Sequence, residues 1–111
     1  MNTSITSPDY PTLYLASTKC VWLITATDGW FPSLTFTDIA IQRGIDWLYI
    51  ERDDIVVMLL SGSNLHVPDV LVVNGTSLKV TFQAFKWFSN LRGFSFLLEL
   101  VEQNGEVQYS F

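Results

Sequence analysis

The chain has 111 residues, of which 49% are hydrophobic and 15% are charged, and its formal net charge at pH 7 is −5. This size and apolar content are typical of one folded domain and exclude a disordered chain. The six basic residues are scattered along an acidic chain, which excludes nucleic acid as a partner, and no apolar run is long enough for direct membrane insertion.

A rigid turn is expected near the start of the chain, where residues 5–11 read Ile-x-Ser-Pro-x-Tyr-Pro. Pro8 and Pro11 fix the backbone φ angle and favour an extended conformation at Ser7 and Tyr10. The segment therefore cannot continue as a helix, and we expect a strand after it.

Residues 20–25 are predicted to form that strand. The two faces of the alternating pattern consist of Cys20, Trp22 and Ile24 on one side and Val21 and Leu23 on the other. Because both faces are apolar, we expect the strand to be buried on both sides.

The rest of the chain also has the period of two that is typical of strands, and no window has a helical period. The predicted strands are 20–25, 33–41, 47–50, 56–60, 70–73, 78–83 and 94–101. Asn74-Gly75 should join two adjacent antiparallel strands, and Asn104-Gly105 makes residues 102–111 either a terminal hairpin, with a last strand at 107–111, or a tail. We therefore predict one all-β domain over residues 1–111, an antiparallel β-sandwich with its core in residues 5–101.

Residues 5–98 resemble a CUB domain. The motifs that carry the resemblance, in chain order, are the opening turn followed by Cys-x-Trp-x-Ile at 20–24, Leu-x-Phe-x-Asp at 34–38, Asp-x-Leu-x-Ile at 46–50, Leu-x-Val-x-Phe at 78–82 and Gly-Phe at 93–94. Three short segments are also similar to attractin-like receptors: Leu-Ser-Gly-Ser at 60–63 and the segments at 18–24 and 67–70. The resemblance implies a jelly-roll-like sandwich that serves as a module of a secreted or membrane-anchored protein.

The cysteine content departs from this family, whose members usually hold two disulfides. Gly44, or a near neighbour, and Ser61 stand at the positions of the second pair, and Cys20 lacks its upstream partner. Cys20 is therefore either free or paired with a residue outside this chain. Apolar packing should replace the missing bonds, and the residues expected to supply it are Trp22, Phe36, Trp47, Phe82, Phe94 and Phe96.

The compartment follows from two opposing signals. A single cysteine favours a reducing compartment, whereas the glycosylation triplets at Asn2 and Asn74 favour the secretory pathway. With the family resemblance we expect an extracellular protein, and a cytosolic one only if Met1 is the true start.

Many CUB domains bind calcium, and the resemblance places the three ligand positions at Gln42, Asp46 and Phe85. Only one of these is a carboxylate, whereas calcium takes six or more oxygen ligands. We therefore predict no metal site and no cofactor. Asp46 is instead expected to accept backbone N–H groups or to pair with Arg43 or Lys86.

Enzyme chemistry has little support in the sequence. Cys20 is predicted to lie in a strand and His66 in a loop, and Asp53 and Asp54 are expected to form a turn because adjacent side chains point apart. No phosphate-binding loop, zinc spacing or catalytic triad signature is present. We predict that the chain is not an enzyme.

Residues 85–88 are the predicted binding loop, because Phe85, Lys86, Trp87 and Phe88 place three aromatic rings and one cation in four positions. Gln42, Arg43 and Asp46 would form the polar rim of this site. The alternative is that the segment only caps the open end of the core. The Trp-Phe-Pro sequence at 30–32 is expected to form a second aromatic loop at the opposite end of the sandwich.

The sequence thus predicts a non-catalytic extracellular module that binds a protein partner, or an adjacent module of the same chain, without calcium. Two alternatives stay open: a structural spacer in a larger receptor, and a glycan-binding protein of the spermadhesin type.

Overall fold

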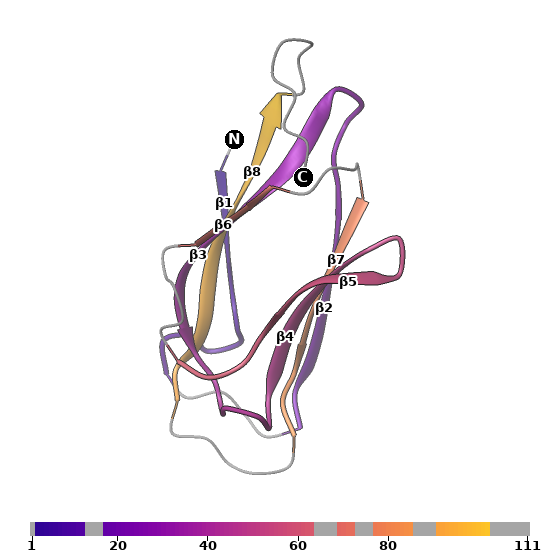
Figure 1. Ribbon diagram of the computed structural model, residues 1–111. Coiled ribbons are helices and arrows are strands. Elements are labelled where there is room, and N and C mark those ends of the chain that lie inside the picture. The colour runs from indigo at the N-terminus through magenta and orange to yellow at the C-terminus, as the bar shows by residue number, and fades with distance from the viewer. Residues whose placement is uncertain (1, 13–16, 64–68, 73–76, 86–90, 103–111) are drawn as a thin grey trace.

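The computed structural model describes residues 2–12, 17–63, 69–72, 77–85 and 91–102, and every regular element in this part of the chain is a strand (Figure 1). The strands are β1 (Asn2–Thr6), β2 (Lys19–Thr25), β3 (Trp30–Ala40), β4 (Trp47–Arg52), β5 (Ile55–Leu60), β6 (Asp69–Val72), β7 (Ser77–Gln83) and β8 (Gly93–Glu102).

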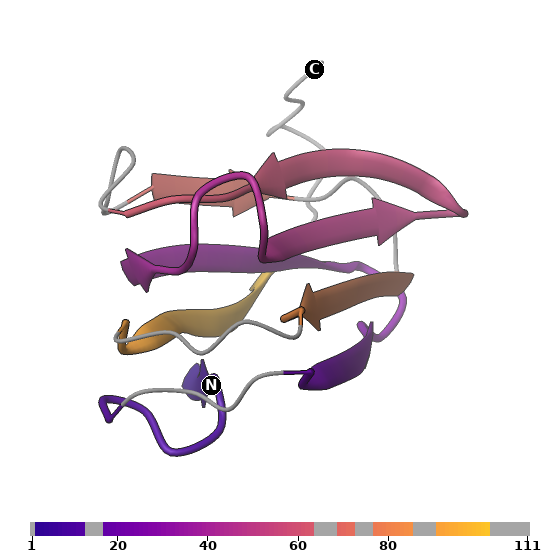
Figure 2. The same ribbon diagram turned by 90° about the horizontal axis from the view of Figure 1, so that it is seen from below.

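The strands form two antiparallel four-stranded sheets, with the orders β1-β8-β3-β6 and β2-β7-β4-β5. Figure 2 shows these sheets as two facing layers. The predicted all-β sandwich is therefore confirmed.

The sequence missed β1, because its residues Asn-Thr-Ser-Ile-Thr lack alternating apolar side chains. Only Ile5 of this strand packs against the core, and it pairs with Phe96 of β8. Backbone pairing at the edge of a sheet thus forms a strand that hydrophobic periodicity does not reveal. The expected strand at 107–111 and the Asn104-Gly105 turn lie outside the described residues.

Two further expectations about connections were wrong. Residues 30–32 are not a loop, because Trp30, Phe31 and Pro32 begin β3 and pair with β8. Asn74-Gly75, itself outside the described residues, does not join neighbouring strands: β6 pairs with β3, whereas β7 pairs with β2 and β4 in the other sheet. An Asn-Gly pair favours a tight turn locally, but the strands that pair are chosen by the packing of the whole sandwich.

Aromatic rings from both sheets fill the space between the layers. Phe36, Phe82, Phe94 and Phe96 are fully buried, and the centroids of the Phe82 and Phe94 rings lie 5.0 Å apart. The indole of Trp22 meets the rings of Phe94 and Phe96 edge-on, at 5.7 and 6.4 Å. These contacts join β2 and β7 of one sheet to β8 of the other, so they hold the layers together.

The expectation that β2 is buried on both faces was wrong. Leu23 is 76% exposed and Val21 is 47% exposed, whereas Ile24 is buried. In a sandwich of two layers each sheet covers only one face of the other, so alternate residues of β2 face solvent. Cys20 is partly buried on the inner side, and this burial raises the pKa of its thiol.

We predict that Phe94→Ala lowers the free energy of unfolding by about 3–5 kcal/mol, because it removes a ring that packs on both sheets and leaves a cavity. The matched control is Phe85→Ala, in which the ring is 50% exposed and the loss should stay below about 1 kcal/mol. Urea unfolding followed by circular dichroism measures both values. Equal losses in the two variants would contradict the assignment of the core.

Candidate functional site

The end of the sandwich between β3 and β4 is built around one buried carboxylate. Asp46 is fully buried. Its Oδ1 accepts a hydrogen bond of 2.8 Å from the backbone N–H of Phe85, and its Oδ2 accepts one of 3.0 Å from the side-chain amide of Gln42. The prediction that Asp46 accepts a backbone N–H is confirmed. This carboxylate fastens the turn before β4 to the segment after β7, at the lower end of Figure 1.

Ser61 fastens the same turn from the other side. Its Oγ accepts a hydrogen bond of 2.7 Å from the N–H of Gly44 and donates to the carbonyl oxygen of Asp46 at 2.8 Å. Gly44 has a φ of 74°, a conformation that glycine adopts without strain. The two positions that the family resemblance assigns to a disulfide are therefore joined here by a hydrogen bond.

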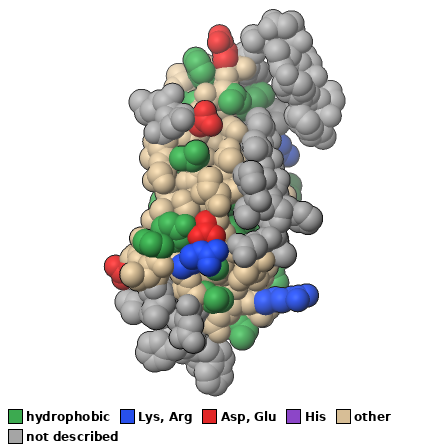
Figure 3. All heavy atoms as spheres, turned by 90° about the vertical axis from the view of Figure 1, so that its left-hand side faces the viewer, with side chains coloured by type: hydrophobic (Ala, Val, Ile, Leu, Met, Phe, Trp, Pro, Cys, Tyr) green, Lys and Arg blue, Asp and Glu red, His purple; other side chains and the backbone are tan. Residues whose placement is uncertain are grey.

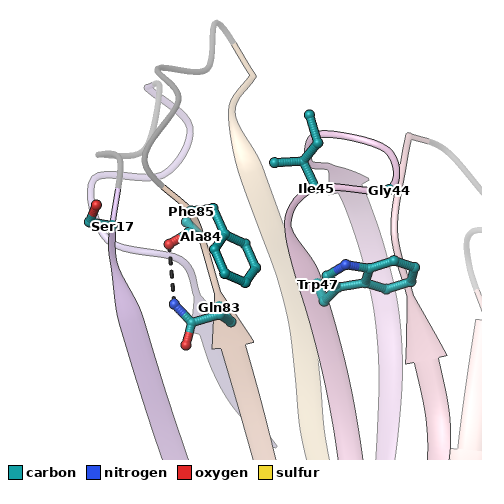
Figure 4. A pocket seen from close by; sticks show the side chains of 7 residues that line it. All are labelled: Ser17, Gly44, Ile45, Trp47, Gln83, Ala84 and Phe85. Atoms are coloured by element: carbon teal, nitrogen blue, oxygen red, sulfur yellow. Dashed lines mark hydrogen bonds between the residues drawn. The ribbon is translucent and has the colours of Figure 1, made fainter.

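The turn and the segment after β7 border an open pocket of about 590 Å³. Figure 4 shows Phe85 on one side of the opening and Trp47 on the other, with Ile45 above Trp47. The pocket is completed by Ser17, Gly44, Gln83 and Ala84. Its exposed apolar side chains, Phe85 at 50% and Ile45 at 37%, offer contact area to a partner.

A second pocket of about 480 Å³ shares Gly44 and Trp47 with the first. It is lined by Arg43, Gly44, Trp47, Leu59, Ser61, Gly62 and Ser63. Sequence reasoning placed Trp47 in the core and so missed its role here. Trp47 is the first residue of β4 and its neighbour Leu48 points inward, so strand alternation turns the indole outward.

The structure thus brings Gln42, Asp46 and Phe85 together through hydrogen bonds, and places Arg43 at the second pocket. The other predicted binding residues, Lys86, Trp87 and Phe88, lie outside the described residues, as do Asn74 and His66. Asp53 and Asp54 form the turn between β4 and β5, as predicted.

The geometry at Asp46 does not fit a calcium ion. Both carboxylate oxygens accept hydrogen bonds from N–H donors, and the amide nitrogen of Gln42 points at the oxygen that a cation would need. Within the described ranges, no group of three or more His, Cys, Asp or Glu side chains gathers in a way that would hold a metal. Calcium takes six or more oxygen ligands, and this end offers hydrogen-bond donors instead.

A polar cluster that sequence reasoning missed pins the first turn of the chain at this end. The Tyr10 hydroxyl donates to Asp38 Oδ2 at 2.5 Å, and the Arg92 guanidinium donates to both Asp38 oxygens, also at 2.5 Å. The Arg92 bonds hold the pKa of the Asp38 carboxyl below its usual value, and the bond to Asp38 raises the pKa of Tyr10. The three residues are 28 and 54 positions apart, so no local motif announces them.

Comparison with known proteins identifies the family. The model of the CUB domain matches residues 1–97, and the chain therefore belongs to the CUB domain family. CUB domains are in general extracellular protein-interaction modules of larger proteins. No helix that could cross a membrane occurs in the described part of the chain.

The chain is similar to segments of much longer proteins. It is 46% identical to cubilin of Rattus norvegicus over 41 residues, which is 37% of this chain and 1% of cubilin. The human MASP-1/3 CUB1-EGF-CUB2 structure is 26% identical with a TM-score of 0.79, over 92% of this chain and 42% of that one. The MASP-1 CUB2 domain bound to Ca²⁺ is 23% identical with a TM-score of 0.77, over 87% and 90% of the two chains, and shows the shared fold. This chain spans 9% or less of the curated relatives that it matches.

We predict that Asp38 makes the stability of the fold depend on acid pH. Arg92 lowers the pKa of Asp38 in the folded state. The stabilisation that the Asp38 carboxylate gives the fold is therefore fully present above 3.8, its pKa in the unfolded chain, and is lost as the pH falls below that value. Urea unfolding of the wild type across this range should show a fall in the free energy of unfolding that is smaller in Asp38→Asn.

The control is Asp28→Asn, which replaces an exposed acid in the loop before β3 and should keep the wild-type pH profile. Arg92→Gln should flatten the profile as Asp38→Asn does, because the guanidinium lowers the pKa. A profile that is the same in all four proteins would show that the Asp38 cluster makes no linked contribution.

Proposed function

We propose that this CUB domain is a non-catalytic extracellular module that binds a protein partner through the end around Trp47 and Phe85, and that it does so without calcium. The observation that carries the proposal is that the partly exposed Trp47 lines two pockets, next to the buried Asp46 carboxylate that bonds to Phe85.

The side chains at this end are of the kind that dominate protein interfaces. Trp and Tyr rings set in pockets are common hot spots, and their contribution is largest where surrounding contacts exclude water. Here Trp47 lines both pockets, and Phe85 and Ile45 extend the apolar surface across the first one. Arg43 and Gln42 supply the polar rim.

The end is also rigid before any partner arrives. The bonds from Phe85 and Gln42 to Asp46, and from Gly44 to Ser61, fix the turn between β3 and β4. A surface that is already ordered loses less conformational entropy on binding, so more of the contact energy appears as affinity.

Calcium independence follows from the donor chemistry. The related MASP-1 CUB2 domain was solved bound to Ca²⁺. In this chain the amide of Gln42 and the N–H of Phe85 occupy both oxygens of Asp46, so hydrogen bonds do the positioning that a cation would otherwise do. Burial raises the pKa of the Cys20 thiol, so this cysteine stays protonated at neutral pH and is a poor nucleophile.

The partner is a separate protein or an adjacent module of the same polypeptide. The curated relatives are many times longer than this chain, so the matching segment in them has covalent neighbours. We propose an extracellular location for this chain on the basis of its family.

We predict that Trp47→Ala and Phe85→Ala each weaken partner binding by about 1–2 kcal/mol or more, while the fold is retained. The chain is used to probe an array of secreted proteins and receptor ectodomains, and the affinity of each hit is then measured by surface plasmon resonance. The matched control is Trp30→Ala, which removes an exposed indole at the opposite end of β3. Hits that bind all three variants as they bind the wild type would contradict the site.

We also predict that calcium changes neither binding nor stability. The melting temperature should be the same in millimolar calcium chloride and in EDTA, because a ligand that binds only the folded state would raise it. Titration calorimetry with calcium chloride alone should show no saturable heat. A calcium-dependent rise in melting temperature that disappears in Asp46→Asn would overturn this prediction.

A further inference from the structure

The outer face of the sheet β2-β7-β4-β5 continues the surface around Trp47. Lys19 on β2 pairs with Gln83 on β7, which pairs in turn with Trp47 on β4, so these three residues form one row across the sheet. Because the next residue of β2 packs against the core, strand alternation turns Lys19 toward solvent. The adjacent row begins at Val21 and ends at Leu59, which are 47% and 56% exposed.

This surface carries positive charge. Lys19 and the pocket residue Arg43 are both exposed, and neither forms an ion pair with another described residue. The two ion pairs within the described part of the chain use other basic residues, in Arg92–Asp38 and Lys79–Glu51.

The same surface holds no acidic group that could neutralise these cations. No aspartate or glutamate occurs among the described residues that form the two rows or line the two pockets. Asp46 lies beside them, but it is fully buried and both of its oxygens accept hydrogen bonds. Two cations and several exposed apolar side chains thus lie together on a chain that has 11 acidic residues and a net charge of −5.

We propose that the partner bound at this end is a protein segment that presents carboxylates on either side of an apolar side chain. The proposal rests on the proposed function and names the chemistry of its partner. The apolar side chain would pack on Trp47, and the carboxylates would pair with Lys19 and Arg43. Charges more than about 8 Å away are largely screened at physiological ionic strength, so these two cations outweigh the negative charge of the rest of the chain.

The spacing of the partner's groups follows from the sheet. Neighbouring strands lie about 4.8 Å apart, so the backbone of Lys19 is about 10 Å from that of Trp47, two strands away. An extended segment covers this distance in about three residues. A carboxylate that meets Lys19 should therefore lie about three positions from the apolar side chain.

Exposed apolar area favours a protein over an anionic polysaccharide. A sulfated polysaccharide would supply anions, but it has no apolar side chains to cover Trp47, Val21 and Leu59. On the outer face of the sheet β1-β8-β3-β6, seen in Figure 3, hydrophobic side chains instead lie among polar side chains and charged ones of both signs.

Synthetic peptides test the proposal. The probe has a central phenylalanine with a glutamate about three positions to each side, and comparison peptides carry glutamine or lysine in place of glutamate. Fluorescence anisotropy measures the Kd of each peptide for the wild type. The glutamate peptide should bind about threefold or more tightly than the glutamine peptide, the lysine peptide should bind most weakly, and the preference for glutamate should shrink as sodium chloride is added.

Two variants locate the charges responsible. Lys19→Gln and Arg43→Gln should each reduce the preference for glutamate over glutamine, and the Kd of the glutamine peptide should hardly change. The matched control is Thr25→Asp, which changes the net charge by the same amount as Lys19→Gln, at an exposed position of the same strand about 20 Å away. This control should keep the preference, and circular dichroism verifies that all three variants are folded.

The proposal is overturned if the glutamate and glutamine peptides bind equally, including the case in which neither binds. It is also overturned if the preference survives in both Lys19→Gln and Arg43→Gln, or if Thr25→Asp abolishes it. Heparin that binds through Lys19 and Arg43, with no preference among the peptides, would overturn it in favour of an anionic polysaccharide.

The array of secreted proteins separates this proposal from the proposed function. Hits that require Trp47 but bind Lys19→Gln and Arg43→Gln as tightly as the wild type would keep the binding site and overturn only the acidic partner. Hits that are indifferent to Trp47→Ala and Phe85→Ala would overturn the binding site itself.

Discussion

The burial of aromatic rings between two sheets is the constraint on which the rest of this CUB domain depends. Phe94 and Phe96 project from β8 toward Phe82 and Trp22 of the opposite sheet, and the layers meet through these rings without a disulfide among the described residues. A single disulfide typically contributes about 2–4 kcal/mol, which is comparable to the burial of one or two large side chains. The apolar core can therefore supply the stability that the family elsewhere takes from covalent bonds.

Hydrogen bonds at one end of the sandwich take over two further tasks. The Gly44 N–H and the Ser61 hydroxyl join the two positions that the family resemblance assigns to a disulfide. Asp46, which the resemblance makes a calcium ligand position, accepts hydrogen bonds from Phe85 and Gln42 instead. Buried polar groups stabilise a structure only when each of them has a hydrogen-bond partner. Among the described residues, no buried side-chain nitrogen or oxygen atom lacks such a partner. The same bonds hold Trp47 and Phe85 in place, so the stability of this end and its proposed binding role have a common origin.

The sequence by itself determined the two-layered β architecture, the family and the aromatic core, because period-two alternation and the spacing of motifs are local properties. It also indicated that Asp46 accepts backbone hydrogen bonds. Only the tertiary structure decided that Leu23 faces solvent and that Trp47 lines two pockets, since alternation shows which residues share a face and not which face is covered. The bond between Asp38 and Arg92 was hidden for a related reason: the two residues are 54 positions apart, and they meet only once β3 and β8 pair.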